Sequence, residues 1–305
     1  PDDATDRETL FTHADTALYR VKTEGRSGYR FFETDMGHEM RERRRIEHDL
    51  RQAIARNELQ LVYQPQLDVQ TGQVTGFEAL LRWHHPERGS VSPAVFIPIA
   101  EEAGAITAIG EWVLRQACRE AASWTQPLMV AVNVSPMQIY DPNFAQTVHT
   151  VLLETGLEPH RLELEITETA LIRELNRALL SLRQIKALGV QIAMDDFGTG
   201  YSSLSNLRAF PFDKIKIDGS FIKSVDHNDQ AATIVRTVLA LGRGLGLPVL
   251  AEGVETAAEL QFLRDQNCDG IQGFLIGRPA SIRQFRELTH GGAAARPPVA
   301  KGGWG

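Results

Sequence analysis

The sequence predicts an α/β protein, built as a modified TIM-type (β/α)8 barrel whose first strand runs antiparallel to the rest. Beyond residue 57, short apolar segments alternate with longer amphipathic ones, and eight of the apolar segments have the character of strands. The first two are separated by only four residues, 70–73, which is the length of a hairpin loop. Strands joined in this way pair antiparallel, so we expect a barrel that is irregular at its start.

Eight strands are expected: Leu59–Val69, Val74–Trp83, Met129–Val134, Leu162–Thr167, Gln191–Asp196, Lys214–Asp218, Pro248–Gly253 and Gly270–Phe274. From the second strand onward, the segment that follows each strand is long enough for a helix. Between them, apolar residues recur at helical spacing, as Ile109, Val113 and Ala117 do. We expect these helices to cover the outside of the barrel.

Two helices are expected before the barrel. The first spans Asp6–Thr23 and leads through a Gly-Arg-Ser-Gly turn to a short strand at Tyr29–Phe32. One helix and one strand cannot enclose a core, so we interpret residues 1–36 as the end of a preceding domain. The second helix, 37–57, carries a sparse apolar stripe among Arg and Glu residues, which is typical of a connector between domains.

The barrel itself is expected over residues 58–288. Residues 289–305 are rich in Gly, Ala and Pro, which predicts a disordered tail. No apolar run is long enough to cross a bilayer and no signal-peptide pattern is present, so direct membrane insertion by this chain is not expected. Cys118 and Cys268 lack the spacing of a zinc site or a disulfide framework, which favours a cytoplasmic location.

The composition is that of an ordinary globular protein, with 43% hydrophobic and 23% charged residues. The formal net charge of −7 argues against binding to a nucleic-acid polymer, because such proteins carry a basic face that replaces phosphate counterions. A small phosphorylated ligand is still compatible with this charge, since bound metal ions can reverse the sign of an acidic pocket.

Polar residues occupy the strand ends, where a barrel places its functional site. Glu78 interrupts an apolar strand, and the others lie at strand carboxyl ends: Asn133, Glu165, Asp195, Asp196, Asp218 and Glu252. Carboxylates gathered in this way repel one another unless cations are present, and hard divalent metals are suitable cations. A single such acid could equally be a helix N-cap, but agreement among six strands favours a shared site.

Several of these residues suggest specific chemistry. The adjacent Asp195 and Asp196 can serve two metal ions, which together clamp the attacking and leaving oxygens of a phosphoryl displacement. Lys216 lies in a strand whose faces alternate, so an inward lysine there needs acidic neighbours. Glu252 is placed to hold a water molecule or to accept its proton. The glycine-containing loop after Asp196 matches neither phosphate-loop pattern and predicts only a flexible loop.

These residues belong to motifs that resemble those of the EAL domain family. Glu78-Ala79-Leu80 is the motif from which that family takes its name. Further motifs follow in register: Asn133–Pro136, Glu165–Glu168, Asp195–Tyr201, Lys214–Asp218, Ala251–Glu255 and Gln272–Gly273. The resemblance covers residues 45–288, and the combination is specific to the family, whereas the three letters alone are not.

The resemblance implies a barrel-shaped phosphodiesterase that hydrolyses cyclic di-GMP to the linear dinucleotide pGpG with two ions of Mg²⁺ or Mn²⁺. Matched positions assign the metal ligands: Glu78, Asn133, Glu165 and Asp195 for one ion, and Asp195 with Asp196 for the other. Glu252 would be the general base or water-positioning group. Lys216 would orient the attacking water or stabilise developing charge.

The resemblance also assigns residues around this centre. Gln64 resembles a guanine contact, and Arg82 resembles a phosphate contact. Gln272 would donate a hydrogen bond to, or accept one from, a metal-bound water. Glu168 would anchor the loop 196–203, although it could also cap the following helix.

Two further acids of the matched motifs, Asp218 and Glu255, are expected to support the site from outside it. Because the loop after Asp196 often lies near a dimer interface in the family, we expect a homodimer. The N-terminal segment is similar to the closing helix and strand of a GGDEF diguanylate-cyclase domain, through Ala14–Tyr19 and Tyr29–Phe31. This similarity implies an upstream GGDEF domain in the full-length protein.

Two other hypotheses remain open from the sequence. Some EAL domains have lost catalysis and act as cyclic di-GMP receptors or interaction modules, but these usually lack metal ligands that are all present here. An unrelated metal-dependent barrel hydrolase would explain the acids but not the joint spacing of the motifs.

Overall fold

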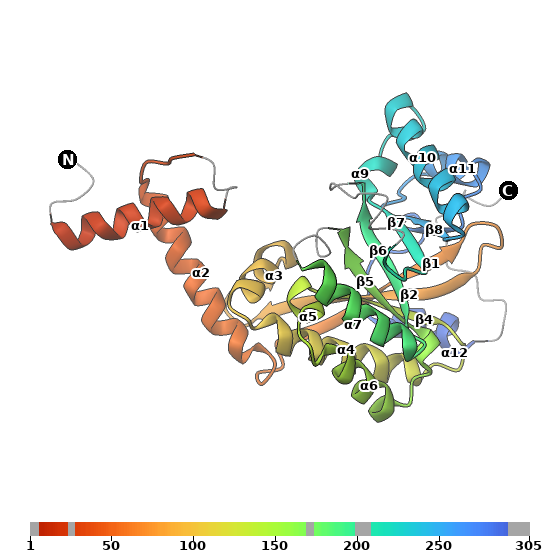
Figure 1. The fold of residues 1–305 in the computed structure, drawn as a ribbon, viewed down its shortest axis with the longest axis horizontal. Helices are drawn as coiled ribbons and strands as arrows, with labels where there is room; N and C mark the ends of the chain where they lie inside the picture. Colours follow the sequence, from red (N-terminus) through yellow and green to blue (C-terminus); the bar gives the residue numbers. More distant parts are fainter. Residues whose placement is uncertain (1–5, 24–27, 169–173, 199–208, 292–305) are drawn as a thin grey trace.

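The computed structural model describes residues 6–23, 28–168, 174–198 and 209–291 of the 305-residue chain. Figure 1 shows a barrel of strands surrounded by helices, with α1 (Arg7–Thr23) and α2 (Thr34–Ala53) on one side of it. The long helix α2 connects the N-terminal segment to the barrel.

Nine strands form one sheet in the described part of the chain, and eight of them close into a barrel. Their bounds are β1 Leu59–Asp68, β2 Val74–His85, β3 Gly89–Val91, β4 Met129–Asn133, β5 Leu162–Thr167, β6 Gln191–Phe197, β7 Lys214–Ile217, β8 Val249–Ala251 and β9 Gly270–Gln272. The order is β1-β9-β8-β7-β6-β5-β4-β2, and β1 pairs back to β2. Strand β1 is antiparallel to both neighbours, whereas the other barrel pairs are parallel. The predicted barrel with an antiparallel first strand is confirmed.

The two faces of each strand differ because successive side chains point to opposite sides. On β5, the outward Leu162, Leu164 and Ile166 are fully buried and belong to the same hydrophobic cluster as the apolar faces of the helices. The inward residues of this strand, Glu163 and Glu165, are also buried. The hydrophobic core therefore lies between barrel and helices, and polar groups line the inside of the barrel.

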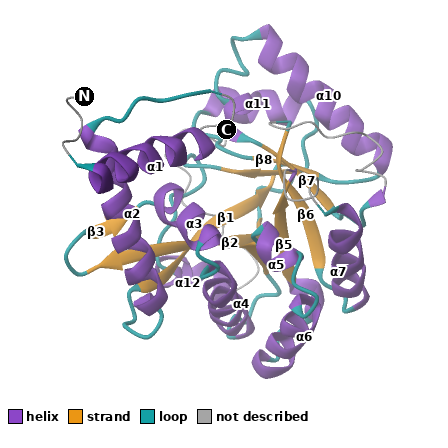
Figure 2. Ribbon diagram, turned by 60° about the vertical axis from the view of Figure 1, so that its left-hand side comes forward, coloured by secondary structure: helices purple, strands orange, loops and turns teal. Residues whose placement is uncertain are grey.

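Helices cover the outside of the barrel, as Figure 2 shows. Their bounds are α3 Pro93–Glu102, α4 Ile106–Ala122, α5 Pro136–Ile139, α6 Phe144–Thr155, α7 Leu175–Ala187, α9 Gly219–Ile222, α10 Asp229–Leu245, α11 Ala257–Asp265 and α12 Arg286–His290. The predicted apolar face of α4 is buried, including Ile109, Val113 and Ala117. The periodicity of the sequence thus identified the packed side of this helix.

Strand β3 was not predicted. It pairs antiparallel with the end of β2, with Trp83 opposite Val91 and His85 opposite Gly89. The strand has only three residues, Gly-Ser-Val, and none of them is buried. Such a short sequence carries no apolar pattern from which a strand could be predicted. It forms because β2 continues beyond Trp83 to His85 and offers an edge for pairing.

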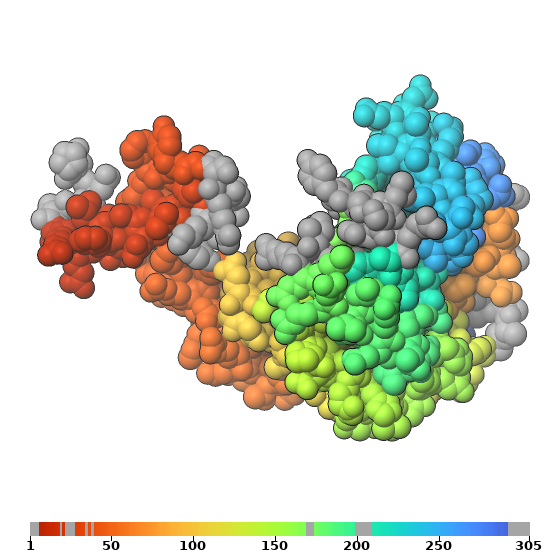
Figure 3. All heavy atoms as spheres, viewed as in Figure 1, coloured from red at the N-terminus to blue at the C-terminus, as the bar shows by residue number. Residues whose placement is uncertain are grey.

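The predicted strand at 29–32 is wrong, because the chain there is neither helical nor extended in a sheet. A strand needs a neighbouring strand, and the sheet of the described residues does not include this segment, where Tyr29 is 80% exposed and Phe31 78% exposed. The helix predicted at 6–23 is confirmed, while the connector helix begins earlier and ends earlier than predicted. Figure 3 shows the N-terminal segment standing apart from the barrel.

Helix α2 is attached to the β2–β3 hairpin by charged side chains. His85 Nε2 lies 3.4 Å from Asp49 Oδ2, and Arg88 contacts both Glu42 and Asp49. On the neighbouring helix α3, Glu102 lies 2.5 Å from the guanidinium of Arg43. These contacts hold helix α2 against the beginning of the barrel.

The C-terminal end of the barrel lies later than predicted. Helix α12 continues to His290, and Thr289 is buried, with its carbonyl accepting a hydrogen bond from the backbone N–H of Gln126. The tail predicted at 289–305 therefore begins too early, and residues 292–305 lie outside the described residues. Cys118 and Cys268 are buried and unpaired, as their spacing predicts. No helix in the described ranges is long and apolar enough to cross a membrane.

Candidate active site

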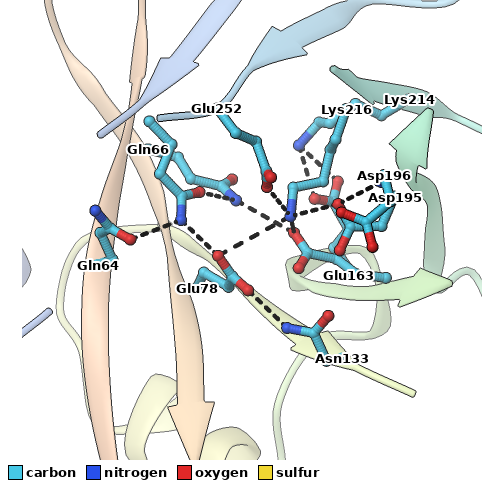
Figure 4. A network of polar contacts seen from close by, with 12 residues as sticks. Gln64, Gln66, Glu78, Asn133, Glu163, Asp195, Asp196, Lys214, Lys216 and Glu252 are labelled. Carbon is cyan, nitrogen blue, oxygen red and sulfur yellow. Dashed lines mark hydrogen bonds and ion pairs between the residues drawn. The ribbon is translucent and has the colours of Figure 1, made fainter. Parts of the chain in front are cut away.

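A lysine lies among four acids inside the barrel, at the carboxyl ends of the parallel strands (Figure 4). The Nζ of Lys216 is 2.6 Å from Glu252 Oε1, 2.8 Å from Glu165 Oε1 and 3.2 Å from Asp195 Oδ1. Its distance to Glu78 Oε2 is 3.9 Å. Lys216 is fully buried, so these carboxylates take the place of water around its charge. The structure thus places the lysine inward, as the alternation of its strand predicts.

The strand register explains why residues far apart in the sequence meet here. Asn133 on β4 lies directly opposite Glu165 on β5, and Glu78 on β2 lies opposite Gln64 on β1. Each is at an inward position of its strand. Strand β1 runs antiparallel to its two neighbours, β2 and β9, so its amide side chains lie in the site on a strand of opposite direction to those that carry the acids.

Two amides hold the carboxylate of Glu78. Asn133 Nδ2 donates to Glu78 Oε1 at 2.6 Å, and Gln272 Nε2 donates to Oε2 at 2.5 Å. Burial acts to raise the pKa of Glu78, but the charge of Lys216 and these two hydrogen bonds outweigh it and hold the pKa below its ordinary value. Glu78 is therefore a carboxylate at neutral pH.

The other acids are less easily ionised. Burial raises the pKa of Glu165 well above its ordinary value; the charge of Glu78 raises it further, and Lys216 opposes both. Burial also raises the pKa of Glu252 to about 8, against the effect of Lys216. For Lys216 burial acts to lower the pKa, but Asp195 and the other acids outweigh it and raise the pKa well above the ordinary value. The site therefore holds more potential negative charge than one lysine neutralises.

The adjacent acids Asp195 and Asp196 both face the site because β6 is irregular at this point. The β6–β7 register shifts between Met194 and Phe197, and Asp196 adopts a positive φ of 55°. A bulge of this kind redirects a side chain that regular alternation would turn outward. One carboxylate oxygen each from Asp195, Asp196 and Glu252 lie within 4.8 Å of one another, a spacing that suits a divalent cation.

One buried oxygen of Glu165 has no hydrogen-bond donor in the described part of the chain. This atom is Oε2, whereas Oε1 is contacted by Lys216 and by Gln66 Nε2. An unpaired buried carboxylate oxygen is costly unless a further group binds it. The donor set of this site is consequently that of a cation site for a hard metal.

The predicted substrate contacts lie on β1 and β2. Gln64 Nε2 donates to the carbonyl of Gly277 at 3.1 Å, while its Oε1 accepts from Gln272 Nε2 at 3.1 Å. Arg82 is half-buried, and its guanidinium donates to the carbonyl of Leu81 at 2.9 Å. A pocket of about 220 Å³ opens over the acids, lined by Gln64, Glu78, Leu80, Asp195, Glu252, Gly253, Glu255, Gln272, Gly273 and Phe274. Arg82 is not among these lining residues.

Three further predicted residues lie around the centre. Glu168 is buried, and its Oε2 accepts from the backbone N–H of Gly198 at 3.3 Å, where the expected loop starts. Residues 199–203 of that loop, and residues 169–173 after Glu168, lie outside the described ranges. Asp218 caps α9 by accepting from Ser220 N at 3.0 Å, so for this acid the helix-cap alternative holds. Glu255 is exposed at the pocket rim.

Sequence reasoning missed two buried polar residues of the barrel interior, Gln66 and Glu163, and the ion pair that Glu163 forms with the half-buried Lys214. Gln66 contacts Gln272 and Glu165. Glu163 and Lys214 form an ion pair at 2.6 Å, two residues before Glu165 and Lys216 on their strands. The alternation of strands β1, β5 and β7 carries the signal that could have found them, because they share a face with predicted residues.

The raised pKa of Glu252 predicts that Glu252→Gln stabilises the EDTA-treated protein at pH 8 but not at pH 5. An unfolded chain releases this proton near pH 4.5, whereas the folded chain keeps it up to about pH 8. The folded state binds more protons in this window, so its stability falls as pH rises. Thermal unfolding of both proteins at the two pH values should show a gap of at least about 2 °C at pH 8. The exposed Glu87→Gln is the control, and equal pH slopes for wild type and Glu252→Gln would refute the prediction.

Fold and site together define a class of protein, a closed α/β barrel with a lysine-centred cluster of acids at its strand ends. Residues 47–279 match the family model described as the EAL domain. The chain therefore belongs to the EAL domain family, in agreement with the resemblance of its motifs.

Relatives and solved structures agree with this assignment. The chain is 56% identical over 292 residues to an uncharacterized signaling protein of Caulobacter vibrioides, covering 96% of this chain and 36% of that protein. It is 44% identical over 289 residues to the bifunctional diguanylate cyclase/cyclic di-GMP phosphodiesterase MucR of Pseudomonas aeruginosa, and the match covers 93% of this chain and 42% of MucR. A structure of the MucR phosphodiesterase in complex with cyclic di-GMP covers 79% of this chain and 99% of its own, with a TM-score of 0.76 and 44% identity. The chain spans less than half the length of these two curated relatives.

Proposed function

We propose that this chain is a metal-dependent phosphodiesterase that hydrolyses cyclic di-GMP to linear pGpG by a two-metal mechanism. The observation that carries the proposal is the meeting of Glu165, Asp195 and Glu252 around Lys216 at the strand ends of an EAL domain. The likeness to a MucR phosphodiesterase solved with cyclic di-GMP supports the choice of substrate.

The proposed metals are two ions of Mg²⁺ or Mn²⁺. The ligands would be Glu78, Asn133, Glu165 and Asp195 for one ion, and Asp195 with Asp196 for the other. Oxygen donors suit hard cations, and the buried Glu165 Oε2, which lacks a donor in the described chain, supports the assignment. When bound, two such ions supply charge stabilisation to the attacking and leaving oxygens of an in-line displacement.

Glu252 is the proposed general base for the attacking water, and Lys216 its orienting partner. In the metal-free site burial raises the pKa of Glu252 to about 8, so this carboxylate takes up a proton more readily than an ordinary glutamate does. The 2.6 Å contact from Lys216 Nζ fixes the Glu252 carboxylate in one orientation. The same buried ammonium would oppose negative charge as it develops on the phosphate.

In the bound substrate, Gln64 would contact a guanine base and Arg82 would contact a phosphate. Gln64 lines the pocket directly. The side chain of Arg82 would have to turn from the carbonyl of Leu81 toward the substrate, a change that its partial exposure permits. Around these groups, Glu168, Asp218, Glu255 and Gln272 would support the site, with Gln272 holding Glu78.

Incubation of the purified chain with cyclic di-GMP and Mg²⁺ or Mn²⁺ tests the proposed function. Chromatography of the products should show pGpG, EDTA should abolish its formation, and excess metal should restore it. Cyclic di-GMP bound tightly in a calorimeter, with no linear product, would instead favour a catalytically silent receptor. If the chain neither binds cyclic di-GMP nor forms pGpG, the phosphodiesterase and the receptor hypotheses are both contradicted.

We further propose that residues 1–36 are the end of a GGDEF domain, followed by a connector and by an EAL barrel that begins at residue 58 and continues through α12. The side chains of Leu10, Phe11 and Leu18 on α1 are 52–61% exposed, which supports a missing apolar partner for this helix. The bifunctional name of MucR supports an upstream cyclase domain. A homodimer and a cytoplasmic location are part of the same proposal, and light scattering of the purified chain tests the dimer.

A further inference from the structure

We propose that Gln66 is a positioning residue that orients the carboxylate of Glu165 and couples it to Glu78 through Gln272. The inference rests on the proposed function, because it concerns how the metal-binding acids are held. Gln66 belongs to none of the motifs that resemble the family and was not predicted from the sequence.

Gln66 lies on the antiparallel strand β1 and points into the barrel. It is 2% exposed, and its backbone pairs with Gln272 on β9. Two residues earlier on the same face, Gln64 pairs with Glu78 on β2. Strand β1 therefore pairs one glutamine with β2 and the next with β9, and Figure 4 shows the side chains of Gln64 and Gln66 within the polar network.

The three glutamines form a chain of hydrogen bonds with one direction. The carbonyl of Gly277 can only accept, so Gln64 Nε2 points toward it and Gln64 Oε1 faces Gln272. Gln272 Nε2 then donates to Gln64 Oε1 at 3.1 Å and to Glu78 Oε2. Its own Oε1 accepts from Gln66 Nε2 at 3.1 Å. The orientation of every amide in this chain is thereby determined.

Gln66, the last residue in this series of hydrogen bonds, contacts Glu165. Gln66 Nε2 lies 3.4 Å from Glu165 Oε1, the oxygen that also contacts Lys216 Nζ at 2.8 Å. Two donors therefore hold the same oxygen from different strands. The other oxygen, Oε2, is buried without a donor in the described residues, which leaves it to the proposed cation.

This arrangement requires an amide at position 66. A carboxylate there could not donate to Gln272 Oε1 and would repel Glu165, while an apolar side chain would leave Gln272 Oε1 buried without a partner. Groups that orient metal ligands in this way typically change metal affinity by about 10- to 100-fold when removed. Loss of the Gln66 amide should therefore weaken metal binding without breaking the barrel.

The test is Gln66→Met, which keeps the length of the side chain and removes both donors. Direct titration with Mn²⁺, followed by the electron paramagnetic resonance signal of the free ion, should show affinity reduced by about 10-fold or more. The Mn²⁺ concentration for half-maximal hydrolysis should rise accordingly, and excess Mn²⁺ should restore most of kcat. The exposed Gln60 on the same strand gives the matched control, since Gln60→Met should bind Mn²⁺ as the wild type does.

A second variant keeps the test decisive if Gln66→Met does not fold. Gln66→Asn keeps an amide but is one methylene too short to hold Gln272 and Glu165 together, so it should also bind Mn²⁺ less tightly. If wild type hydrolyses cyclic di-GMP while every variant that folds binds Mn²⁺ unchanged, the positioning role is refuted and the proposed function stands. If wild type binds no Mn²⁺ and forms no product, the proposed function itself fails.

Discussion

Lys216→Met is expected to lose hydrolysis and much of the stability of the metal-free protein together. The Nζ of the fully buried Lys216 lies within 3.2 Å of Glu165, Asp195 and Glu252, whose side chains are at most 20% exposed. Removing one partner of a buried ion pair costs about 3–5 kcal/mol, because the other charge is left without compensation. Protonation of the acids relieves part of this cost, and a drop of about 10 °C in the thermal midpoint remains the expected result.

A double variant separates the electrostatic reason from a packing defect. Adding Glu165→Gln to Lys216→Met replaces one of the buried acids that lost its cation with a neutral amide, so it should recover part of the stability but none of the hydrolysis. Lys186→Met is the control, because Lys186 pairs with Asp213 outside the site and the two side chains are 27% and 26% exposed, so this ion pair contributes less than a fully buried one. A Lys216→Met protein as stable as wild type in EDTA would contradict the interpretation of this lysine as the compensating charge.

The architecture was predictable because its signals are local. The four residues 70–73 between two apolar segments are too few for a crossover, so β1 and β2 can pair only as an antiparallel hairpin. Buried parallel strands read as short apolar runs, and the helices between them keep apolar faces. Strand β3 and the segment 29–32 fall outside this logic. Each depends on whether an edge lies nearby in space, and the sequence of the segment does not contain that information.

The centre of the site was predictable for a different reason. Glu165, Asp195 and Glu252 stand at the ends of apolar strands, and parallel strand ends converge. What the sequence could not decide is the role of each acid. Asp218 occupies the same kind of position but caps α9, because a short helix begins directly after it. Arg82 faces inward yet lies outside the lining of the pocket.

Each of the residues that were missed lies two positions along its strand from a predicted site residue. Glu163 and Lys214 precede the site acids by two positions on strands of only four to six residues, and each reads as the polar start of a strand. Gln66 reads as an ordinary polar residue of an alternating strand. Only the register between strands places it beside Gln272 and Glu165, and that register depends on contacts between distant parts of the chain.

Glu252→Gln is expected to reduce kcat for cyclic di-GMP hydrolysis by about 10²- to 10⁴-fold while leaving the fold and substrate binding intact. The amide has the shape of the carboxylate and keeps an oxygen toward Lys216, but it cannot accept a proton from water. KM should change little, because the loss concerns a step that occurs only in the transition state. Initial rates of pGpG formation at saturating Mn²⁺ give kcat, and calorimetry gives the affinity for cyclic di-GMP.

The comparison with Glu255→Gln makes this result specific to proton transfer. Glu255 lines the same pocket three residues later and is exposed, so its neutralisation changes the charge of the pocket without touching Lys216. If charge alone governed the rate, both variants would lose similar activity. A much larger loss in Glu252→Gln than in Glu255→Gln assigns the proton to Glu252, and equal losses would reject it as the base. Because Glu252 reaches Lys216 at 2.6 Å, the same pair of residues then joins the two predictions: the lysine that stabilises the buried acids also orients the one that accepts the proton.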